Sequence, residues 1–370
     1  MQIPAFKLER YFARYEFNVK YVLCASDCES FSIQDILDFE PKASELFHQH
    51  WLGYTESQGS PSLQREICNL YDHIQPEQVL VHTGAEEAIF LFMHAVLDAE
   101  DHIIVHWPCY QSLFEVARSI GSQVTLWQAC EATGWSLDLD ELKQHIRPNT
   151  KAVIVNTPHN PTGHLMPPQV FQEIVRICRD KGIILFSDEV YRESEYRPED
   201  RLPAACDLGE HTVSLGVMSK TYGLAGLRIG WIATQHADIY DRMASLKDYT
   251  TICNSAPSEF LAELALRHRE KLVARNMGII TRNLALLDQF FARHADRFAW
   301  QRPTAGLIGF PRLIGENVDD FCKDLVEDAG VLLLPGTLYD DSGNHFRIGF
   351  GRQNFPDALL RLEEYSGRWL

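Results

Sequence analysis

The sequence lacks the features that would place the chain in a membrane or on a nucleic acid. No run approaches the roughly 18 uninterrupted apolar residues that a membrane-spanning helix needs, and the opening MQIPAFKLERYFARYEF has no apolar signal core. Lys and Arg number 34 against 51 Asp and Glu, which gives a formal net charge of −17. We therefore expect a cytoplasmic protein that binds small metabolites and neither nucleic acid nor membrane.

Paired cysteines and nucleotide-binding loops are also missing. The nine cysteines are scattered and show neither a C-x-x-C pair nor zinc-like spacing, so we expect reduced thiols and no metal site. No G-x-G-x-x-G follows an apolar run, and the stretch SLGVMSKT lacks the G-x-x-x-x-G-K arrangement of a Walker loop. These absences argue against a Rossmann dehydrogenase and against a P-loop nucleotidase.

Short apolar runs alternate with amphipathic ones between about residues 60 and 250. The expected strands are EQVLVHTGA, HIIVHW, QVTLWQA, KAVIVNTP and GIILFSDEV, and the expected helices are AEEAIFLFMHAVL, QSLFEVARSIG and PQVFQEIVRICRDKG. Several strands are apolar without alternation, which indicates burial on both faces. The pattern predicts an α/β fold with a mostly parallel sheet between helices, whose ligands bind beyond the carboxyl ends of the strands.

A chain of 370 residues exceeds what one core usually fills, so we expect a second, smaller domain. Residues 257–294 are predicted to form one long helix or two consecutive helices, and later segments mix strand and helix patterns. We expect an N-terminal segment, 1–40, that packs with the small domain. The large domain is expected at 41–265 and the small α+β domain at 266–370.

Polar residues follow the expected strands. Asn160 stands in NPTG, Asp188 and Tyr191 stand in SDEVY, and Lys220 and Arg228 stand in SKTYGLAGLR. Each has an ordinary explanation when taken singly, because an aspartate after a strand often caps a helix and NPTG is common in turns. The two cations lie in a run of small and apolar residues, where we expect both to be buried. A buried lysine has a lowered pKa and is a better nucleophile.

The four motifs NPTG, SDEVY, SKTYGLAGLRIGW and FRIGFG together resemble the class I/II aminotransferases, which are pyridoxal-phosphate enzymes of fold type I. The resemblance runs from Tyr54 to Arg347, with the motifs in family order. It implies a seven-stranded type of sheet and pyridoxal 5'-phosphate as the cofactor. It also implies that the chain moves an amino group between an α-amino acid and a 2-keto acid.

The resemblance assigns the reactive end of the cofactor to four residues. Lys220 would form the Schiff base and carry the proton, and Asp188 would face the pyridine nitrogen. Asn160 and Tyr191 would reach the phenolic oxygen. Asn160 would also border the substrate.

Further residues are assigned to the phosphate, the ring and the substrate. The phosphate would be held by Arg228 and Ser219, together with backbone N–H groups at the start of a helix, at Gly84, Ala85 and Glu86. Tyr110 would stack on the ring, and Arg347 would bind the substrate α-carboxylate. Tyr54 would reach the phosphate of a neighbouring subunit, which implies a homodimer with shared sites. Gly223 and Gly226 are expected to permit a close backbone approach.

Two other functions stay open. The N-terminal segment more weakly resembles the capreomycidine-synthase branch, so a lyase or cyclase of the same fold is the alternative. A non-enzymatic regulator would need a DNA-binding module, for which about 50 residues before Tyr54 leave little room. Residues 23–30, LCASDCES, replace a glycine-proline turn that touches the substrate carboxylate in many relatives. Substrate specificity is expected to depend on the N-terminal segment and on residues 247–260.

Overall fold

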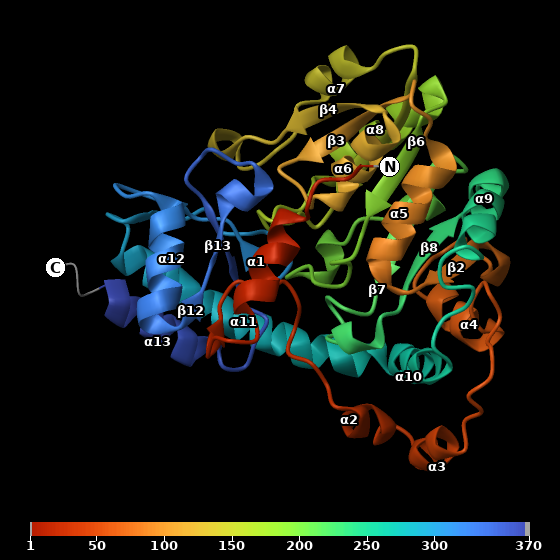
Figure 1. The fold of residues 1–370 in the computed structure, drawn as a ribbon, viewed down its shortest axis with the longest axis horizontal. Coiled ribbons are helices and arrows are strands. Elements are labelled where there is room, and N and C mark those ends of the chain that lie inside the picture. Colours follow the sequence, from red (N-terminus) through yellow and green to blue (C-terminus); the bar gives the residue numbers. More distant parts are fainter. Residues whose placement is uncertain (1, 367–370) are drawn as a thin grey trace.

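The computed structural model describes residues 2–366, and its central feature is a seven-stranded sheet (Figure 1). The strand order is β2-β8-β7-β6-β5-β3-β4. Only β8 runs antiparallel to its two neighbours, and the other pairs are parallel. The bounds are Val79–His82 (β2), His102–Trp107 (β3), Gln123–Gln128 (β4), Thr150–Asn156 (β5), Ile184–Asp188 (β6), Thr212–Val217 (β7) and Gly230–Thr234 (β8). The predicted mostly parallel sheet is confirmed.

Helices cover both faces of this sheet because its inner strands are apolar on both sides. Ile103 and Val105 belong to one buried cluster, with side chains from Gly84–Val96 (α5) and Ser112–Ile120 (α6). Ile104, between them in β3, belongs to another cluster, with side chains from Leu139–His145 (α7) and Pro168–Lys181 (α8). Alternate residues of one strand therefore enter opposite cores.

Local signals define the ends of the covering helices. Helix α8 has proline in its first turn, where the missing N–H removes no helical hydrogen bond. The helix is terminated by Gly182, whose φ is 66°. The predicted helical stretch after residue 256 is interrupted at His268. It forms two consecutive helices, Ala256–Arg267 (α10) and Arg269–Arg293 (α11).

The remaining helices of the sheet region lie at its outer edge. Figure 1 shows α2 and α3 as an extension away from the sheet. Their bounds and those of the neighbouring helices are Ile33–Leu37 (α2), Ala43–His48 (α3), Pro61–Cys68 (α4) and Ala237–Lys247 (α9).

The C-terminal region combines short strands with two helices. Strand β14 lies between β10 and β13, and β11 pairs with β9. The bounds are Phe298–Ala299 (β9), Ile308–Gly309 (β10), Arg312–Leu313 (β11), Val318–Ala329 (α12), Val331–Leu332 (β12), Leu334–Pro335 (β13), Phe346–Gly349 (β14) and Phe355–Ser366 (α13).

The N-terminal segment contacts both regions. It contains Lys7–Tyr15 (α1) and Tyr21–Val22 (β1), and β1 pairs in parallel with β12 of the C-terminal region. Helix α2 instead packs against α10, at the edge of the sheet region. The domain boundaries at residues 40 and 265 stay predictions.

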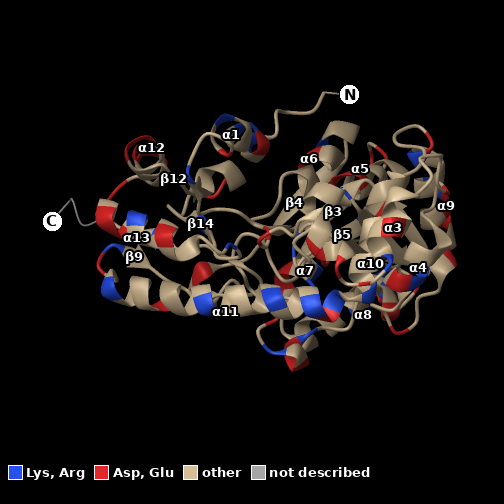
Figure 2. Ribbon diagram, turned by 90° about the horizontal axis from the view of Figure 1, so that it is seen from below, with Lys and Arg blue, Asp and Glu red and all other residues tan. Residues whose placement is uncertain are grey.

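Figure 2 shows charged residues along helix α11, whereas the seven strands of the sheet contain only two, Lys151 in β5 and Asp188 at the end of β6. Within residues 2–366, no helix is both long enough and apolar enough to cross a membrane. All nine cysteines are free thiols, and six of them are buried: Cys24, Cys28, Cys109, Cys178, Cys206 and Cys322.

Candidate active site

A cavity of about 550 Å³ lies beyond the carboxyl ends of β5, β6 and β7, where helix α1 closes one side. This is the edge of a parallel sheet at which ligands bind. The cavity brings together most of the predicted site residues: Ala85, Glu86, Tyr110, Asn160, Asp188, Tyr191, Ser219, Lys220 and Arg228.

Lys220 lies in the loop after β7 and points into the cavity. Its Nζ donates a hydrogen bond to Ser26 Oγ at 3.0 Å and lies 5.9 Å from the ring centre of Tyr191. Burial lowers the pKa of Lys220, and the Arg347 guanidinium lowers it further, while the carboxylates of Asp27 and Asp188 oppose them. The lowered pKa increases the share of neutral amine, which is the nucleophilic form.

Asp188 ends β6 directly beside Asn156, the last residue of β5. The Asn156 side chain donates to the backbone oxygen of Asp188 at 2.9 Å, and the Val190 N–H donates to Asp188 Oδ1 at 3.2 Å. Burial raises the pKa of Asp188 to about 7, although the nearby Lys220 ammonium opposes that shift. A cation placed against this carboxyl would stabilise its ionised form.

An anion site is formed where helix α5 begins. Gly84 has a φ of 80°, and a Cβ there would lie 2.6 Å from Arg228 Nη2. Ser219 Oγ is buried beside the cavity and has no hydrogen-bond partner within the part of the chain described. One space is therefore bordered by a helix N-terminus, a guanidinium and an unpaired hydroxyl. This set of donors fits a phosphate dianion.

The expectation that Arg228 is buried is wrong. The residue is exposed, and its Nη1 donates to the Ala225 backbone oxygen at 3.4 Å. The guanidinium borders the open cavity, so solvent reaches it.

The two glycines predicted to permit a close approach lie in different surroundings. A Cβ at Gly223 would lie 2.7 Å from the Glu29 backbone oxygen, so this glycine permits the approach of the N-terminal segment. Gly226 has open space, because no atom outside its immediate chain neighbours lies within 4 Å of a Cβ built there. The glycine that the packing requires is Gly230, where a Cβ would lie 2.7 Å from the Gly84 carbonyl carbon.

Arg347, in β14, is 1% exposed and lies behind the cavity wall. Its Nε and Nη2 donate to the Cys24 backbone oxygen at 3.1 and 2.9 Å, and its Nη1 lies 3.4 Å from Asn160 Oδ1. Tyr339 donates to the same Asn160 oxygen at 3.0 Å and accepts a hydrogen bond from Arg347. Most of the guanidinium is thus held by protein acceptors. Tyr339 carries no motif, and the sequence interpretation missed it.

Tyr54 does not lie in the cavity. Tyr54 is 84% exposed, and the nearby Trp51 and Leu52 are each 78% exposed. Within one chain, the structure therefore does not bring Tyr54 to the other predicted site residues.

Other cavity residues that the sequence interpretation missed come from the N-terminal segment: Glu9, Phe12, Glu16, Ser26 and Asp27. Tyr110 donates its phenolic hydrogen to Glu9 Oε1 at 2.8 Å, which links α1 to the cavity wall. The spacing of residues 9, 12 and 16 is that of one helix face, so helical periodicity was the available signal.

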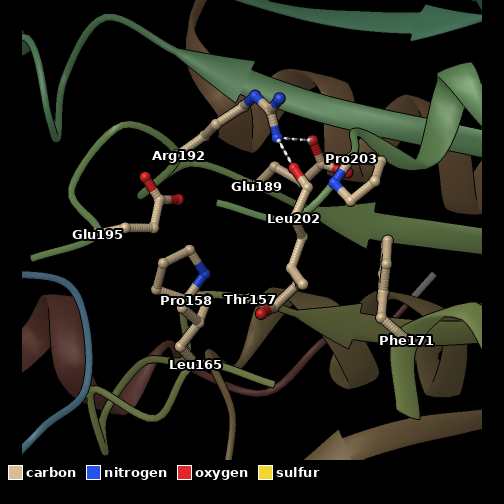
Figure 3. A pocket seen from close by; sticks show the side chains of 9 residues that line it. All are labelled: Thr157, Pro158, Leu165, Phe171, Glu189, Arg192, Glu195, Leu202 and Pro203. Atoms are coloured by element: carbon tan, nitrogen blue, oxygen red, sulfur yellow. Dashed lines mark hydrogen bonds and ion pairs between the residues drawn. The ribbon is translucent and has the colours of Figure 1, made fainter. Parts of the chain in front are cut away.

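A second cavity of about 10 Å³ lies behind the end of β6 (Figure 3). Arg192 Nη1 donates to the Leu202 backbone oxygen at 2.7 Å and lies 4.0 Å from Glu189 Oε2. The space admits about one water and no metabolite. Among the residues that the structure describes, no group of three or more His, Cys, Asp or Glu is placed to hold a metal ion.

Comparison with known proteins gives relatives over nearly the whole chain. The chain is 26% identical to capreomycidine synthase from Streptomyces vinaceus, over 99% of this chain and 94% of that protein. It is 28% identical to aspartate aminotransferase from Geobacillus stearothermophilus, over 91% of this chain and 88% of that protein.

Solved structures agree with these relatives. A pyridoxal-phosphate-dependent aminotransferase from Streptococcus suis matches with a TM-score of 0.93 and 31% identity, over 100% of this chain and 99% of that chain. The pyridoxal-phosphate-dependent cyclase OrfR matches with a TM-score of 0.90 and 30% identity, over the same shares. The family model for class I and II aminotransferases matches residues 19–356. The chain therefore belongs to the class I and II aminotransferases, and it is an enzyme that uses pyridoxal 5'-phosphate.

Proposed function

We propose that this aminotransferase moves the amino group of an α-amino acid to a 2-keto acid in the 550 Å³ cavity, with Lys220 as the attachment point of the cofactor. One observation carries the proposal. A single cavity unites a lysine of lowered pKa, a buried carboxyl at the end of β6 and the anion site at the start of α5.

The cavity residues fit pyridoxal phosphate. When bound, this group supplies an aldehyde that reacts with amines and a ring that withdraws electrons from the substrate Cα. Arg228, Ser219 and the N–H groups of Ala85 and Glu86 hold its phosphate. Tyr110 covers one face of its ring.

The other polar residues act on the reacting atoms. The Asp188 carboxylate holds a proton on the ring nitrogen, since an anion there stabilises the cationic form. Asn160 and Tyr191 donate hydrogen bonds to the phenolic oxygen. Lys220 Nζ would accept the proton that leaves the substrate Cα and deliver it to the carbon that carried the cofactor aldehyde, after which hydrolysis by water would release the keto acid.

Arg347 binds the substrate α-carboxylate, beside Asn160. Its guanidinium is positioned by Tyr339 and by the Cys24 backbone oxygen, so the segment before Ser26 takes part in admitting the substrate. Residues 247–260 border the entrance from a second subunit and contribute to specificity.

The active form is a cytoplasmic homodimer in which Tyr54 reaches the phosphate bound by the partner subunit. The exposed apolar side chains support this assembly. Trp51, Leu52, Tyr54 and Tyr249 are each more than three-quarters exposed, and their burial in a dimer would remove apolar surface from water.

The reaction is tested by its stoichiometry in a single turnover. The enzyme loaded with its cofactor should yield one keto acid per site and convert the cofactor to its amine form, without release of ammonia. Borohydride reduction and peptide mapping should locate the cofactor on Lys220. Lys220→Ala should lose activity by about two to four orders of magnitude, the usual contribution of a positioned acid–base group. Ammonia or water released with an unchanged cofactor would contradict transamination.

A cyclase of the same fold is the second candidate. It is favoured by the similarity over the whole chain to proteins named capreomycidine synthase and cyclase OrfR. In that case the single turnover would give a cyclic amino acid and no keto acid.

A further inference from the structure

Helix α1 presents an acidic and aromatic face to the active-site cavity. Glu9 and Phe12 lie in the helix and Glu16 is its C-cap residue, and all three line the cavity. Spacings of three, four and seven residues place them on one side of a helix. Figure 1 shows α1 between the sheet and the C-terminal region, and these three residues form its contribution to the cavity wall.

The other carboxyl groups of the cavity already have partners. Both oxygens of Asp27 accept hydrogen bonds from Arg352 Nη2, at 2.8 and 2.9 Å. Glu86 accepts a hydrogen bond from Ser112 at 3.2 Å, and burial raises its pKa to about 7. In the proposed function, Asp188 binds the protonated ring nitrogen of the cofactor.

Glu9 and Glu16 lack such compensation. One oxygen of Glu9 accepts the Tyr110 hydroxyl, and no other hydrogen bond or ion pair reaches that carboxylate from the described part of the chain. The Glu16 carboxylate forms no hydrogen bond or ion pair with any of residues 2–366. Burial raises the pKa of Glu16, and the neighbouring charges of Asp27 and Glu9 raise it further, while the charges of Arg352 and Arg347 oppose the shift. Two partly buried carboxyl groups thus face the cavity, and no Lys, Arg or His side chain among the described residues forms an ion pair with either of them.

The cavity is a ligand site on grounds that do not involve these glutamates. Ser219, which also lines the cavity, is 7% exposed, and its hydroxyl is buried without a partner within the residues described. The volume of about 550 Å³ leaves room for a substrate beside a cofactor.

We propose that the substrate is an α-amino acid whose side chain carries a cation on an apolar stem, and that Glu9 and Glu16 bind that cation. The inference rests on the proposed function of the same site. Phe6 and Phe12 supply the apolar wall for the stem. A substrate such as aspartate would place another carboxylate beside these anions, so the chain rejects it even though several relatives are named aspartate aminotransferases.

The test compares amino acids of matched shape and different charge. Single-turnover conversion of the cofactor-loaded enzyme is measured with arginine against citrulline, lysine against norleucine, and glutamate against glutamine. Arginine and lysine should exceed their neutral partners at least about tenfold in the ratio of rate to half-saturation constant, because a charge-assisted hydrogen bond contributes that much. Aspartate and glutamate should be the poorest substrates.

Two variants assign the preference to α1. Glu9→Gln and Glu16→Gln should each raise the half-saturation concentration for arginine about tenfold and leave citrulline nearly unchanged. The matched control is Glu327→Gln, the same change at an exposed position of α12. This control should change the half-saturation concentration neither for arginine nor for citrulline.

The possible results separate this inference from the function on which it rests. If no amino acid converts the cofactor, the proposed function fails and this inference fails with it. If glutamate, aspartate or the neutral partners react as well as the cationic amino acids, transamination stands and the inference is overturned. Equal losses for arginine and citrulline in both α1 variants would also overturn it, because they would show a structural role only.

Discussion

At the scale of single residues, Asp188 shows how burial prepares a carboxyl for a charged ligand. The side chain is 5% exposed and its pKa is raised to about 7, chiefly by burial. Its charge is therefore costly until a cation faces it. The Lys220 ammonium supplies part of that compensation, and the pyridine nitrogen would supply the rest.

The stability of the cofactor-free enzyme should reveal this residue. A carboxyl with a raised folded pKa contributes stability that is fully present below its unfolded pKa, near 3.8, and is lost as the pH rises to about 7. Relative to Asp188→Asn, the wild type should lose up to about 4 kcal/mol of unfolding free energy between about pH 4 and pH 8. Denaturant unfolding of both proteins across this range measures the difference. A difference that does not change with pH would contradict the shift.

At the scale of elements, the anion site depends on how closely β8 approaches the turn before α5. Gly230 begins β8, and a Cβ there would lie 2.7 Å from the Gly84 carbonyl carbon and 2.8 Å from the Ala85 nitrogen. Both contacts are to backbone, which has no flexible side chain to move aside. The N–H groups assigned to the phosphate are therefore positioned by a glycine in a different element.

Gly230→Ala should weaken cofactor binding, because the added methyl group displaces the turn that carries these N–H groups. We expect a loss of at least about tenfold in affinity, measured by titrating the cofactor-free protein with pyridoxal phosphate. Gly278→Ala is the matched control, since Gly278 lies within α11 and, apart from the backbone of its own helix, no atom of the described residues lies within 4 Å of a Cβ built there. That change should stabilise the fold by about 0.5 to 1 kcal/mol and leave cofactor affinity unchanged. Equal affinity in both variants would contradict the role of Gly230.

At the scale of the whole molecule, two features point to assembly beyond one chain. Tyr54 and its neighbours expose apolar side chains away from the cavity of their own subunit. The segment of residues 247–256 adds Tyr249 and Ile252, which are 89% and 53% exposed. A symmetric dimer would bury such a surface and bring Tyr54 to the other cavity.

Subunit mixing tests the shared site. Tyr54→Ala and Lys220→Ala homodimers should each be nearly inactive. In a mixed dimer one site carries both lesions and the other carries neither. Random exchange should therefore restore about one quarter of the wild-type activity. No recovery after verified exchange, or a fully active monomer in sedimentation, would exclude the shared site.

Much of the sheet and several cavity residues were predictable from local sequence. The apolar runs around Ile104 and Val153 carry the signal of strands buried on both faces, and Asp188 follows such a run directly. Chain order then places Asn156 and Asp188 at the same sheet edge, because both end parallel strands. The assigned roles of these side chains stay predictions until the experiments above are done.

The sequence by itself determined the family, the central sheet and the residues that end its strands, because spacing and local chemistry carry that information. Only the tertiary structure decided that α1 turns Glu9 and Glu16 toward the cavity and that Arg228 is exposed. It also decided that Arg347 bonds to the backbone of Cys24, which lies 323 residues away in the chain. Such contacts depend on how distant segments pack, and a residue's own neighbours in sequence do not specify that packing.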